Sequence, residues 1–338
     1  GSGDDILLLA AGDHAAMNAG TQIKGGDGTD KVGILDATAA LTDAVYTKIN
    51  AMDSIEVIGI NAATVVDATK LTGSKIFSFD TDAIQGVTSL ATGSELIFTV
   101  AHAATTSASM GVGVSDLSVQ IGQSASNTEA ATAGIAIGGN TTIAATAVAL
   151  SSLGTNAAAN SIVLKNADNS TYTITGTNDL TITGTIATAI GSKFDGSAFT
   201  GKLNVTGNAT AFGTGTPLGD ILIGGSGADT LTAAVNGGTL TGNAGADTFD
   251  VSVALGGITA TYQTTTITDF TLGDKIDFGA TAGAFTAGKV DLSGAASVGA
   301  ALDLLAAGNN SDLKWGNYGG NTYIGDDVDA GGTFAATD

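Results

Sequence analysis

The chain has 338 residues, and its 32 acidic side chains outnumber its 11 basic ones, which gives a formal net charge of −21. It contains no cysteine, so disulfide bonds and thiolate metal sites are excluded. Because a surface this acidic repels nucleic acid and anionic lipid, and because no stretch is apolar enough to span a bilayer, we expect neither nucleic-acid binding nor membrane insertion.

Residues 1–98 begin with two copies of a Gly–Asp turn. The first, GSGDDILLL, places Asp5 two residues before Leu7, and the second, GGDGTDKVG, contains Asp27 and places Asp30 two residues before Val32. Since Asp5 and Asp30 lie 25 residues apart, we expect them to flank one wide coil of chain. The pattern then predicts a helix over 36–50, from its apolar spacing, and strands over 54–60 and 74–79.

A second internal repeat links two distant parts of the chain. The heptapeptide DATKLTG starts at Asp67, and DGSAFTG starts at Asp195. Each precedes a short strand, so we interpret the two as equivalent rungs of one solenoid; chance similarity of two turns is the alternative. Between them, residues 99–178 are rich in Ala, Ser and Thr and nearly uncharged, with apolar residues at alternate positions. We predict a small inserted β domain there, which either contacts a neighbouring copy of the chain or is simply solvated.

Residues 179–250 contain the most regular pattern. Four apolar residues recur every nine positions, namely Leu222, Leu231, Leu240 and Phe249. An aspartate precedes three of them by two residues, at Asp220, Asp229 and Asp247, whereas Gly238 takes that place before Leu240. Glycines fill the half-repeat before the later aspartates. A period of nine with this content is typical of a calcium-binding β-roll built from short parallel strands.

Stacked strands would join the apolar residues into one column and bring aspartates of successive turns together. Like charges at that distance repel unless a cation lies between them, and Ca²⁺ takes six to eight oxygen ligands of this kind. The alternative is that Asp and Gly serve only as turn formers. We expect several calcium ions, with ligands drawn from Asp5, Asp27, Asp30, Asp220, Gly225, Gly227, Asp229, Gly245, Asp247 and Asp274.

Residues 251–338 predict a C-terminal cap of a different kind. Residues 264–278 are typical of a strand, a turn carrying Asp269 and Asp274, and a second strand. A helix follows over 297–307 with Gly308 at its end, and residues 314–332 predict a hairpin with an acidic loop. The predicted fold class is therefore mainly β: a right-handed parallel β-solenoid with calcium-binding turns, an inserted β domain and a few short helices.

Signs of catalysis are missing from the sequence. The two histidines, His14 and His102, form no HExxH zinc motif, and no GxSxG nucleophile elbow occurs. Ser226 lies in GGSGAD, which a calcium turn explains. Aspartate pairs such as Asp326 and Asp327 could imitate a glycosidase dyad, but no aromatic sugar platform accompanies them. We expect a protein that is not an enzyme.

Five segments carry a resemblance to known families. GGDGTDKV, GGSGADTL and GNAGADTF resemble the calcium motifs of repeats-in-toxin proteins. ITDFTLGDKIDF is similar to the segment that follows such repeats in proteins exported by type I secretion. The tail, LDLLAAGNNSDLKWGNYGGNTYIGDDVDAGGTF, resembles the C-terminal region of surface-layer proteins of the Caulobacter and Campylobacter kind.

The resemblance implies a secreted structural protein whose calcium-loaded solenoid packs with copies of itself into a two-dimensional lattice at the bacterial cell surface. It also implies an N-terminal region, beyond this chain, that binds lipopolysaccharide, and an uncleaved C-terminal export signal whose last part this chain lacks. A type I secreted adhesin or biofilm-matrix protein is the alternative. Whole immunoglobulin-like modules would favour an adhesin, and the sequence shows none.

Overall fold

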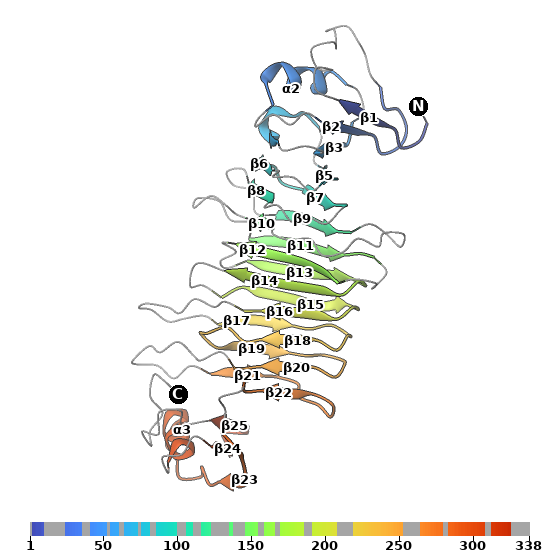
Figure 1. Cartoon of the computed structure of the whole chain (residues 1–338). Helices are drawn as coiled ribbons and strands as arrows, with labels where there is room; N and C mark the ends of the chain where they lie inside the picture. Colours follow the sequence, from blue (N-terminus) through green and yellow to red (C-terminus); the bar gives the residue numbers. More distant parts are fainter. Residues whose placement is uncertain are drawn as a thin grey trace.

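The computed structural model describes residues 2–9, 24–35, 41–52, 55–60, 64–73, 76–81, 86–99, 106–110, 116–122, 135–137, 146–154, 159–165, 170–185, 191–207, 219–252, 264–279, 283–307 and 312–325. The described chain is mainly β, with long all-parallel sheets and two short helices (Figure 1). This arrangement is consistent with a parallel β-solenoid, because the chain advances one strand layer at a time from the N-terminal to the C-terminal end.

The first sheet has twelve parallel strands and runs the length of the stack. In spatial order they are β1 (Ile6–Leu9), β2 (Lys31–Ile34), β3 (Val57–Ile60), β5 (Ile76–Phe79), β7 (Ser94–Phe98), β9 (Asp116–Ile121), β11 (Ala147–Ser152), β13 (Thr171–Gly176), β15 (Lys193–Phe199), β17 (Asp220–Ile223), β19 (Gly238–Thr241) and β21 (Thr265–Ile267).

Opposite this sheet lie two further parallel sheets, which we call together the second row. One contains β4 (Val65–Asp67), β6 (Gly86–Leu90), β8 (Thr106–Met110) and β10 (Ile135–Ile137). The other contains β12 (Asn160–Lys165), β14 (Leu180–Thr185), β16 (Leu203–Thr206), β18 (Thr230–Thr232), β20 (Thr248–Asp250) and β22 (Lys275–Asp277). From β3 onward the chain alternates between the first sheet and the second row, so each coil contributes one strand to each.

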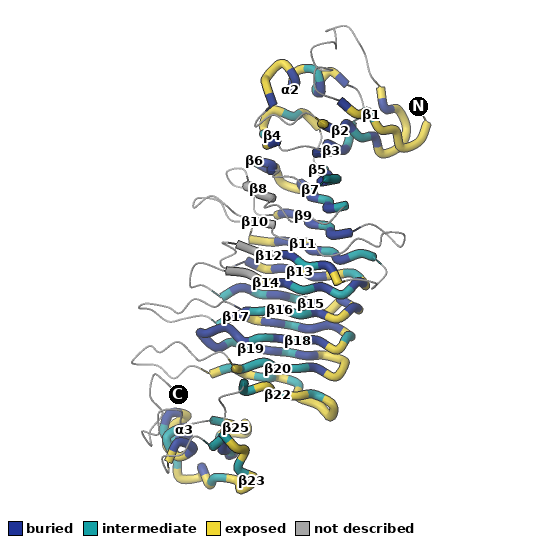
Figure 2. Tube along the Cα trace, in the orientation of Figure 1, coloured by how far each residue is buried: buried dark blue, intermediate teal, exposed yellow. Residues whose placement is uncertain are grey.

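The core lies between the two rows and is built from residues at alternate positions of each strand. Parallel pairing places equivalent side chains on top of one another: Leu222 faces Leu240, and Leu231 faces Phe249. All four are buried. Since burying a side chain of this size contributes about 1.5–3 kcal/mol, the stacked columns are the main source of cohesion between coils. Figure 2 shows the buried positions running through the stack.

The nine-residue apolar ladder is therefore split between two columns. Leu222 and Leu240 belong to the first sheet, while Leu231 and Phe249 belong to the second row. One coil takes eighteen residues here, because Asp229 and Asp247 occupy equivalent places 18 residues apart. The prediction of a single column with a nine-residue coil is wrong, because each nine-residue unit supplies only half of a coil.

Residues 99–178 do not stand apart from the stack in the described part of the chain. Their strands β9, β11 and β13 lie between β7 and β15 in the first sheet, and β8, β10 and β12 lie in the second row. The described part of the expected insertion thus consists of coils that continue the stack. Alternation of apolar residues is the same in a solenoid coil and in a separate β domain, so the pattern could not distinguish the two.

The two heptapeptide repeats also occupy different places. Asp67 ends β4 in the second row, whereas Asp195 lies within β15 in the first sheet. What they share is a turn, because each carboxylate accepts a hydrogen bond from the backbone N–H two residues later, at Thr69 and Ser197, both at 3.1 Å. The similarity reflects common turn chemistry and not equivalent rungs.

Helix α2 (Asp43–Asn50) covers the N-terminal edge of the second row. Its buried face adds Val45 and Ile49 to the main core. The Tyr46 hydroxyl accepts a hydrogen bond from the backbone N–H of Asp67, the last residue of β4, at 2.6 Å. The helix therefore satisfies an edge group that another strand would otherwise pair with. It begins later than the predicted 36–50, and residues 36–40 lie outside the described part.

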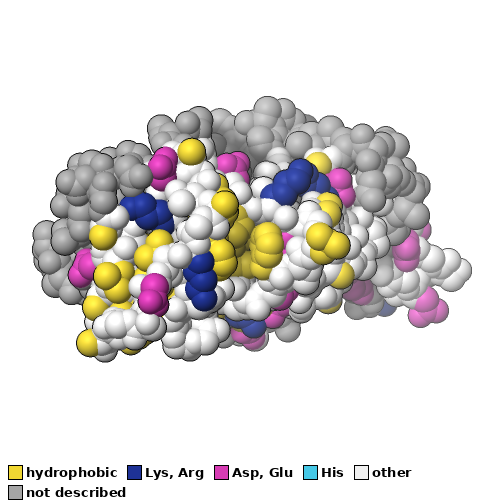
Figure 3. Space-filling model, turned by 90° about the horizontal axis from the view of Figure 1, so that it is seen from below, with side chains coloured by type: hydrophobic (Ala, Val, Ile, Leu, Met, Phe, Trp, Pro, Cys, Tyr) yellow, Lys and Arg dark blue, Asp and Glu magenta, His cyan; other side chains and the backbone are white. Residues whose placement is uncertain are grey.

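The C-terminal unit has its own small core. It contains β23 (Phe285–Val290), α3 (Val298–Ala306), β24 (Leu313–Tyr318) and β25 (Asn321–Gly325). Leu292, Leu302 and Leu305 are buried in it. The predicted helix is confirmed and Ser297 caps it, while the predicted hairpin is confirmed as the antiparallel pair β24–β25. Gly308 and the acidic loop after Gly325 lie outside the described residues. Seen from this end, hydrophobic, basic and acidic side chains intermingle on the surface (Figure 3).

Candidate metal centre

Three Gly–Asp turns stack along one edge of the molecule, each leading from the first sheet into the second row. They span 224–229, 242–247 and 268–274. In this stack the backbone N–H of Asp229 donates to Oδ1 of Asp247 at 2.8 Å, and that of Asp247 donates to Oδ1 of Asp274 at 2.9 Å. We call Asp229, Asp247 and Asp274 the carboxylate column. Each of its first two members is linked through its N–H to the carboxylate of the next coil.

Glycine is required where these turns touch. Gly245 has φ +142°, a conformation that residues with a side chain rarely adopt. A Cβ on Gly245 would lie 2.0 Å from the carbonyl oxygen of Gly227 in the preceding coil and 3.1 Å from Oδ1 of Asp247. Within its own turn, the N–H of Gly225 donates to Oδ2 of Asp229 at 2.6 Å. The three predicted glycines thus all lie beside the carboxylate column.

Burial raises the pKa values of two carboxylates in the column. Asp229 and Asp247 are each about 1% exposed. Burial raises the pKa of Asp229 to about 6, with the neighbouring charge of Asp247 adding to the rise, against the opposing effect of hydrogen bonds from the Leu203 and Gly225 amides. Burial likewise raises the pKa of Asp247, helped by the charges of Asp274 and Asp269. The folded chain therefore holds two carboxylates that resist ionisation.

The outermost turn behaves differently. At Asp274, burial acts to raise the pKa, but hydrogen bonds from the Asp247 and Thr271 amides outweigh it and the net shift is downward. Asp269, in the same turn, accepts hydrogen bonds from the N–H groups of Gly242 at 2.8 Å and Asn243 at 2.7 Å. Asp269 was not among the predicted ligands, although its place in a Gly–Asp turn could have pointed to it.

The remaining predicted residue of this region, Asp220, lies on the opposite edge. It begins β17, at the entry to the first sheet, and its Oδ1 accepts from the Ser192 N–H at 2.8 Å. Gly238, at the equivalent place in β19, stacks against the Asp220 backbone. Since successive nine-residue units fall on alternate edges, Asp220 and Asp229 do not stack on each other. The expected single ladder of aspartates is thus divided between two edges.

The N-terminal turns repeat the arrangement of the column. The N–H of Asp5 donates to Oδ1 of Asp30 at 2.9 Å, and that of Asp30 donates to Oε2 of Glu56 at 2.9 Å. Gly28, at φ +131°, packs where a Cβ would lie 2.6 Å from the carbonyl oxygen of Gly3. The backbone of Asp27 joins this stack, because its carbonyl accepts from the Gly3 N–H at 2.7 Å.

Two features of this N-terminal stack were not predicted from the sequence. Asp30 is about 1% exposed, and its Oδ2 is buried without a hydrogen-bond partner among the described residues. Glu56 was missed because it is not an aspartate. Its spacing of 26 residues from Asp30, close to the 25 between Asp5 and Asp30, is the signal that could have identified it.

The donor set is compatible with calcium but depends on the main chain. No group of three or more acidic or histidine side chains gathers closely enough to hold a metal within the described ranges. Carbonyl oxygens must therefore supply part of any coordination shell, as Ca²⁺ permits. The Gly227 carbonyl oxygen and the Asp247 carboxylate converge on the space that a Gly245 side chain would fill. Both are hard oxygen donors, and so is the buried Oδ2 of Asp30.

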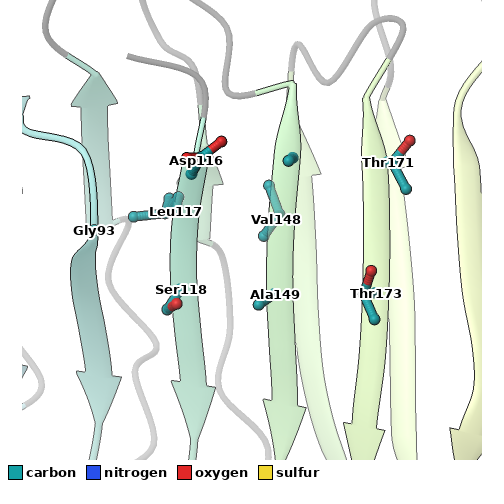
Figure 4. A pocket seen from close by; sticks show the side chains of 9 residues that line it. Gly93, Asp116, Leu117, Ser118, Val148, Ala149, Thr171 and Thr173 are labelled. Atoms are coloured by element: carbon teal, nitrogen blue, oxygen red, sulfur yellow. The ribbon is translucent and has the colours of Figure 1, made fainter.

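A shallow groove on the outer face of the first sheet offers little chemistry. It has a volume of about 200 Å³ and lies across β9, β11 and β13. In Figure 4, Ser118, Ala149 and Thr173 lie in a row on neighbouring strands, in agreement with their pairing register. Asp116 is the only titratable side chain among the lining residues. The groove therefore lacks the paired groups that acid–base catalysis requires.

Comparisons with known proteins give no family assignment: no protein-family model matches the chain, and no curated protein is similar to it in sequence. Neither of the two helices in the described part is long and apolar enough to cross a membrane.

Proposed function

We propose that this chain is a non-enzymatic structural subunit of a calcium-dependent surface-layer lattice outside a bacterial cell, and that its partners are copies of itself. The observation that carries the proposal is the carboxylate column, in which Asp229 and Asp247 are buried and stacked through an N–H to carboxylate hydrogen bond. A repeated stack of acidic turns on a long parallel core fits a structural subunit better than an enzyme. The resemblance of the tail to surface-layer proteins supports the same role.

The fold that we propose in detail is a right-handed solenoid whose Gly–Asp turns bind calcium. Right-handedness is supported by the strong preference of parallel strand connections for that hand. Asp229, Asp247 and the Gly227 carbonyl would hold an ion in the column, and Asp30 with Glu56 would hold one near the N-terminus. A bound divalent cation would supply the positive charge that the buried carboxylates of Asp229, Asp247 and Asp30 lack.

The energetic effect of calcium follows from mass action. Calcium modules that work outside cells bind with dissociation constants of about 10⁻⁴–10⁻³ M. At a tenfold excess over that constant, each site adds about 1.4 kcal/mol to the stability of the folded state. Several sites together are comparable with the total stability of a domain, which is about 5–15 kcal/mol. The folded state would thus depend on the calcium level of the surroundings.

Circular dichroism with and without calcium tests this dependence. We expect the chelated chain to gain strong β signal and resistance to urea when millimolar calcium is added. Magnesium at the same concentration is the control, because its stricter octahedral geometry suits carbonyl-rich turns poorly. Equal β signal and equal urea midpoints in chelator and in calcium would overturn the calcium role.

The lattice requires a separate test. Electron microscopy of the folded chain in calcium should show ordered two-dimensional sheets that disperse when a chelator is added. A calcium-folded chain that stays monomeric at every concentration would contradict the lattice while leaving the calcium role intact. If such monomers bound cell-surface glycans, an adhesin would be the better interpretation.

A further inference from the structure

Lys31 and Asp80 form an ion pair on the outer face of the first sheet that differs from the two other pairs of the described chain. Lys31 Nζ lies 2.5 Å from Asp80 Oδ2, and the side chains are only 19% and 15% exposed. In the pairs Lys70–Asp43 and Lys193–Asp195 the lysine side chains are about twice as exposed, at 42% and 40%. A partly shielded pair of opposite charges loses part of its hydration, and well-aligned hydrogen bonds are needed to compensate for that loss.

The hydrogen bonding of the Asp80 carboxylate is incomplete. Although Nζ is close to Oδ2, the contact lacks the geometry of a hydrogen bond, and Oδ2 is buried without one. The other oxygen, Oδ1, accepts from the Ser78 hydroxyl at 2.5 Å and from the Thr99 hydroxyl at 2.9 Å. The carboxylate is therefore polarised: two donors hold one oxygen, and the amine faces the other.

The strands hold these groups together from three different coils. Lys31 lies on β2, Ser78 on β5 and Thr99 directly after β7. The Lys31 side chain crosses β3, where Gly59, in register with Ser78, has no side chain to block its path. Lys31 Nζ also donates to Ser78 Oγ at 3.1 Å. The sheet register thus fixes the amine beside the carboxyl group before any reaction.

We propose that Lys31 and Asp80 condense to an intramolecular isopeptide bond. A proton passes from the ammonium to Oδ2, and the neutral Nζ then attacks Cγ of Asp80. The negative charge that develops on Oδ1 is stabilised by the Ser78 and Thr99 hydroxyls, as in an oxyanion hole. Oδ2 takes a second proton from Nζ and leaves as water. One C–N bond forms, one C–O bond breaks, and no external oxidant, reductant or activated co-reactant is needed.

The fold favours this condensation in two ways that free solution does not. Holding amine and carboxyl group in contact replaces a bimolecular encounter. Excluding water opposes the reverse hydrolysis. The product also removes two partly buried charges and the oxygen that has no hydrogen-bond partner. It would join coils whose residues are 49 positions apart in a chain without cysteine, in which no disulfide can do so (80 minus 31).

Mass spectrometry of the folded chain tests whether the isopeptide bond between Lys31 and Asp80 forms. We expect the intact chain to be lighter than its sequence by one water molecule, and a protease digest to contain one branched peptide that holds both Lys31 and Asp80. Succinimide formation at an aspartate also loses water, but it joins no peptides and does not depend on Lys31. Full intact mass, with the two peptides separate after prolonged incubation of the folded chain, would overturn the proposal.

Variants of Lys31 and Ser78 test the roles of these two residues in the reaction. Lys31→Met should restore the full mass and abolish the branched peptide, whereas Lys193→Met and Lys70→Met should leave the branched peptide unchanged. Ser78→Ala should slow its formation by about 10²-fold, the effect of losing one oxyanion donor. An unchanged rate in Ser78→Ala would remove Ser78 from the mechanism. The wild-type measurement stands even if Lys31→Met fails to fold.

Discussion

The backbone N–H of Asp229 donates to the carboxylate of Asp247, 18 residues later and one coil further along the stack. The same relationship holds between Asp5 and Asp30 at the other end of the chain. In both places a carboxylate that the sequence marks as a metal ligand also closes a backbone hydrogen bond. We propose that these aspartates also bind calcium, and substitutions can separate that role from the hydrogen bond.

Asp247→Ala and Asp247→Asn should differ. The alanine variant leaves the buried Asp229 N–H without its acceptor, which costs about 1–3 kcal/mol in the free energy of unfolding. The asparagine variant retains an oxygen in that place, so we expect it to keep most of the stability in chelator but to gain less from calcium. Urea unfolding with and without calcium measures both effects. Asp291→Asn, in an exposed turn of the C-terminal unit, is the control and should change little.

Stability in chelator should fall as the pH rises from 5 to 7. The pKa of Asp229 is about 6 in the folded chain, above its ordinary value of 3.8, so the folded state binds more protons than the unfolded state between these values. Raising the pH through 6 removes that proton and its stabilising contribution. The raised pKa of Asp247 acts in the same direction. Urea midpoints across this range give the slope.

Asp229→Asn provides the matched control for the pH dependence. It removes the titrating group and should flatten the slope. Calcium should have a similar effect, because a bound cation favours the ionised carboxylate and lowers its pKa. A wild-type chain that becomes more stable between pH 5 and pH 7 in chelator would contradict the assignment of a raised pKa to Asp229.

Gly245→Ala should destabilise the stack strongly. The added methyl group would meet the Gly227 carbonyl oxygen at 2.0 Å, and the backbone would be held at φ +142°. Backbone strain of this kind costs about 1–3 kcal/mol, and the steric overlap adds to it. Gly288→Ala is the matched control, because nothing lies within 4 Å of its Cβ position. Similar melting temperatures for the two variants would show that the coils do not pack at Gly245 as described.

Tyr46→Phe should loosen the N-terminal edge of the second row. It removes the hydroxyl that accepts the Asp67 N–H at 2.6 Å, while leaving the buried ring in place. We expect a loss of about 1 kcal/mol in the free energy of unfolding. Hydrogen exchange should show faster exchange at the Asp67 amide than at the first-sheet amides of β9 and β11. Unchanged protection of that amide would argue against a capping role for α2.

Local patterns predicted much of the secondary structure. Helix α3, the hairpin β24–β25 and the strands around Val57–Ile60 and Ile76–Phe79 follow from apolar spacing and turn residues. These signals are local, so the sequence alone contains them. Parallel stacking of short strands joined by glycine-rich turns was also expected, because glycine-rich turns and regularly repeated leucines are typical of a β-roll.

What could not be predicted depends on which strands become neighbours. A nine-residue ladder is compatible with one column or two, and only the pairing of Leu222 with Leu240 decides between them. The same ambiguity placed Asp220 and Asp229 together in the predicted site, although they lie on opposite edges. Glu56 and Asp269 escaped notice because their roles arise from coils 26 or 27 residues away and not from a local motif.

The stacking of each coil on the next determines how the chain folds and how it responds to a local defect. Contacts such as Asp229 to Asp247 link neighbouring layers, and the Lys31–Asp80 pair spans two. The molecule therefore behaves as a nearly one-dimensional array in which stability accumulates mainly from nearest-neighbour terms. Folding can start wherever two layers first associate, and it then propagates layer by layer in both directions. By the same logic, a lesion in one layer should divide the array into shorter ordered blocks and not melt it as a whole.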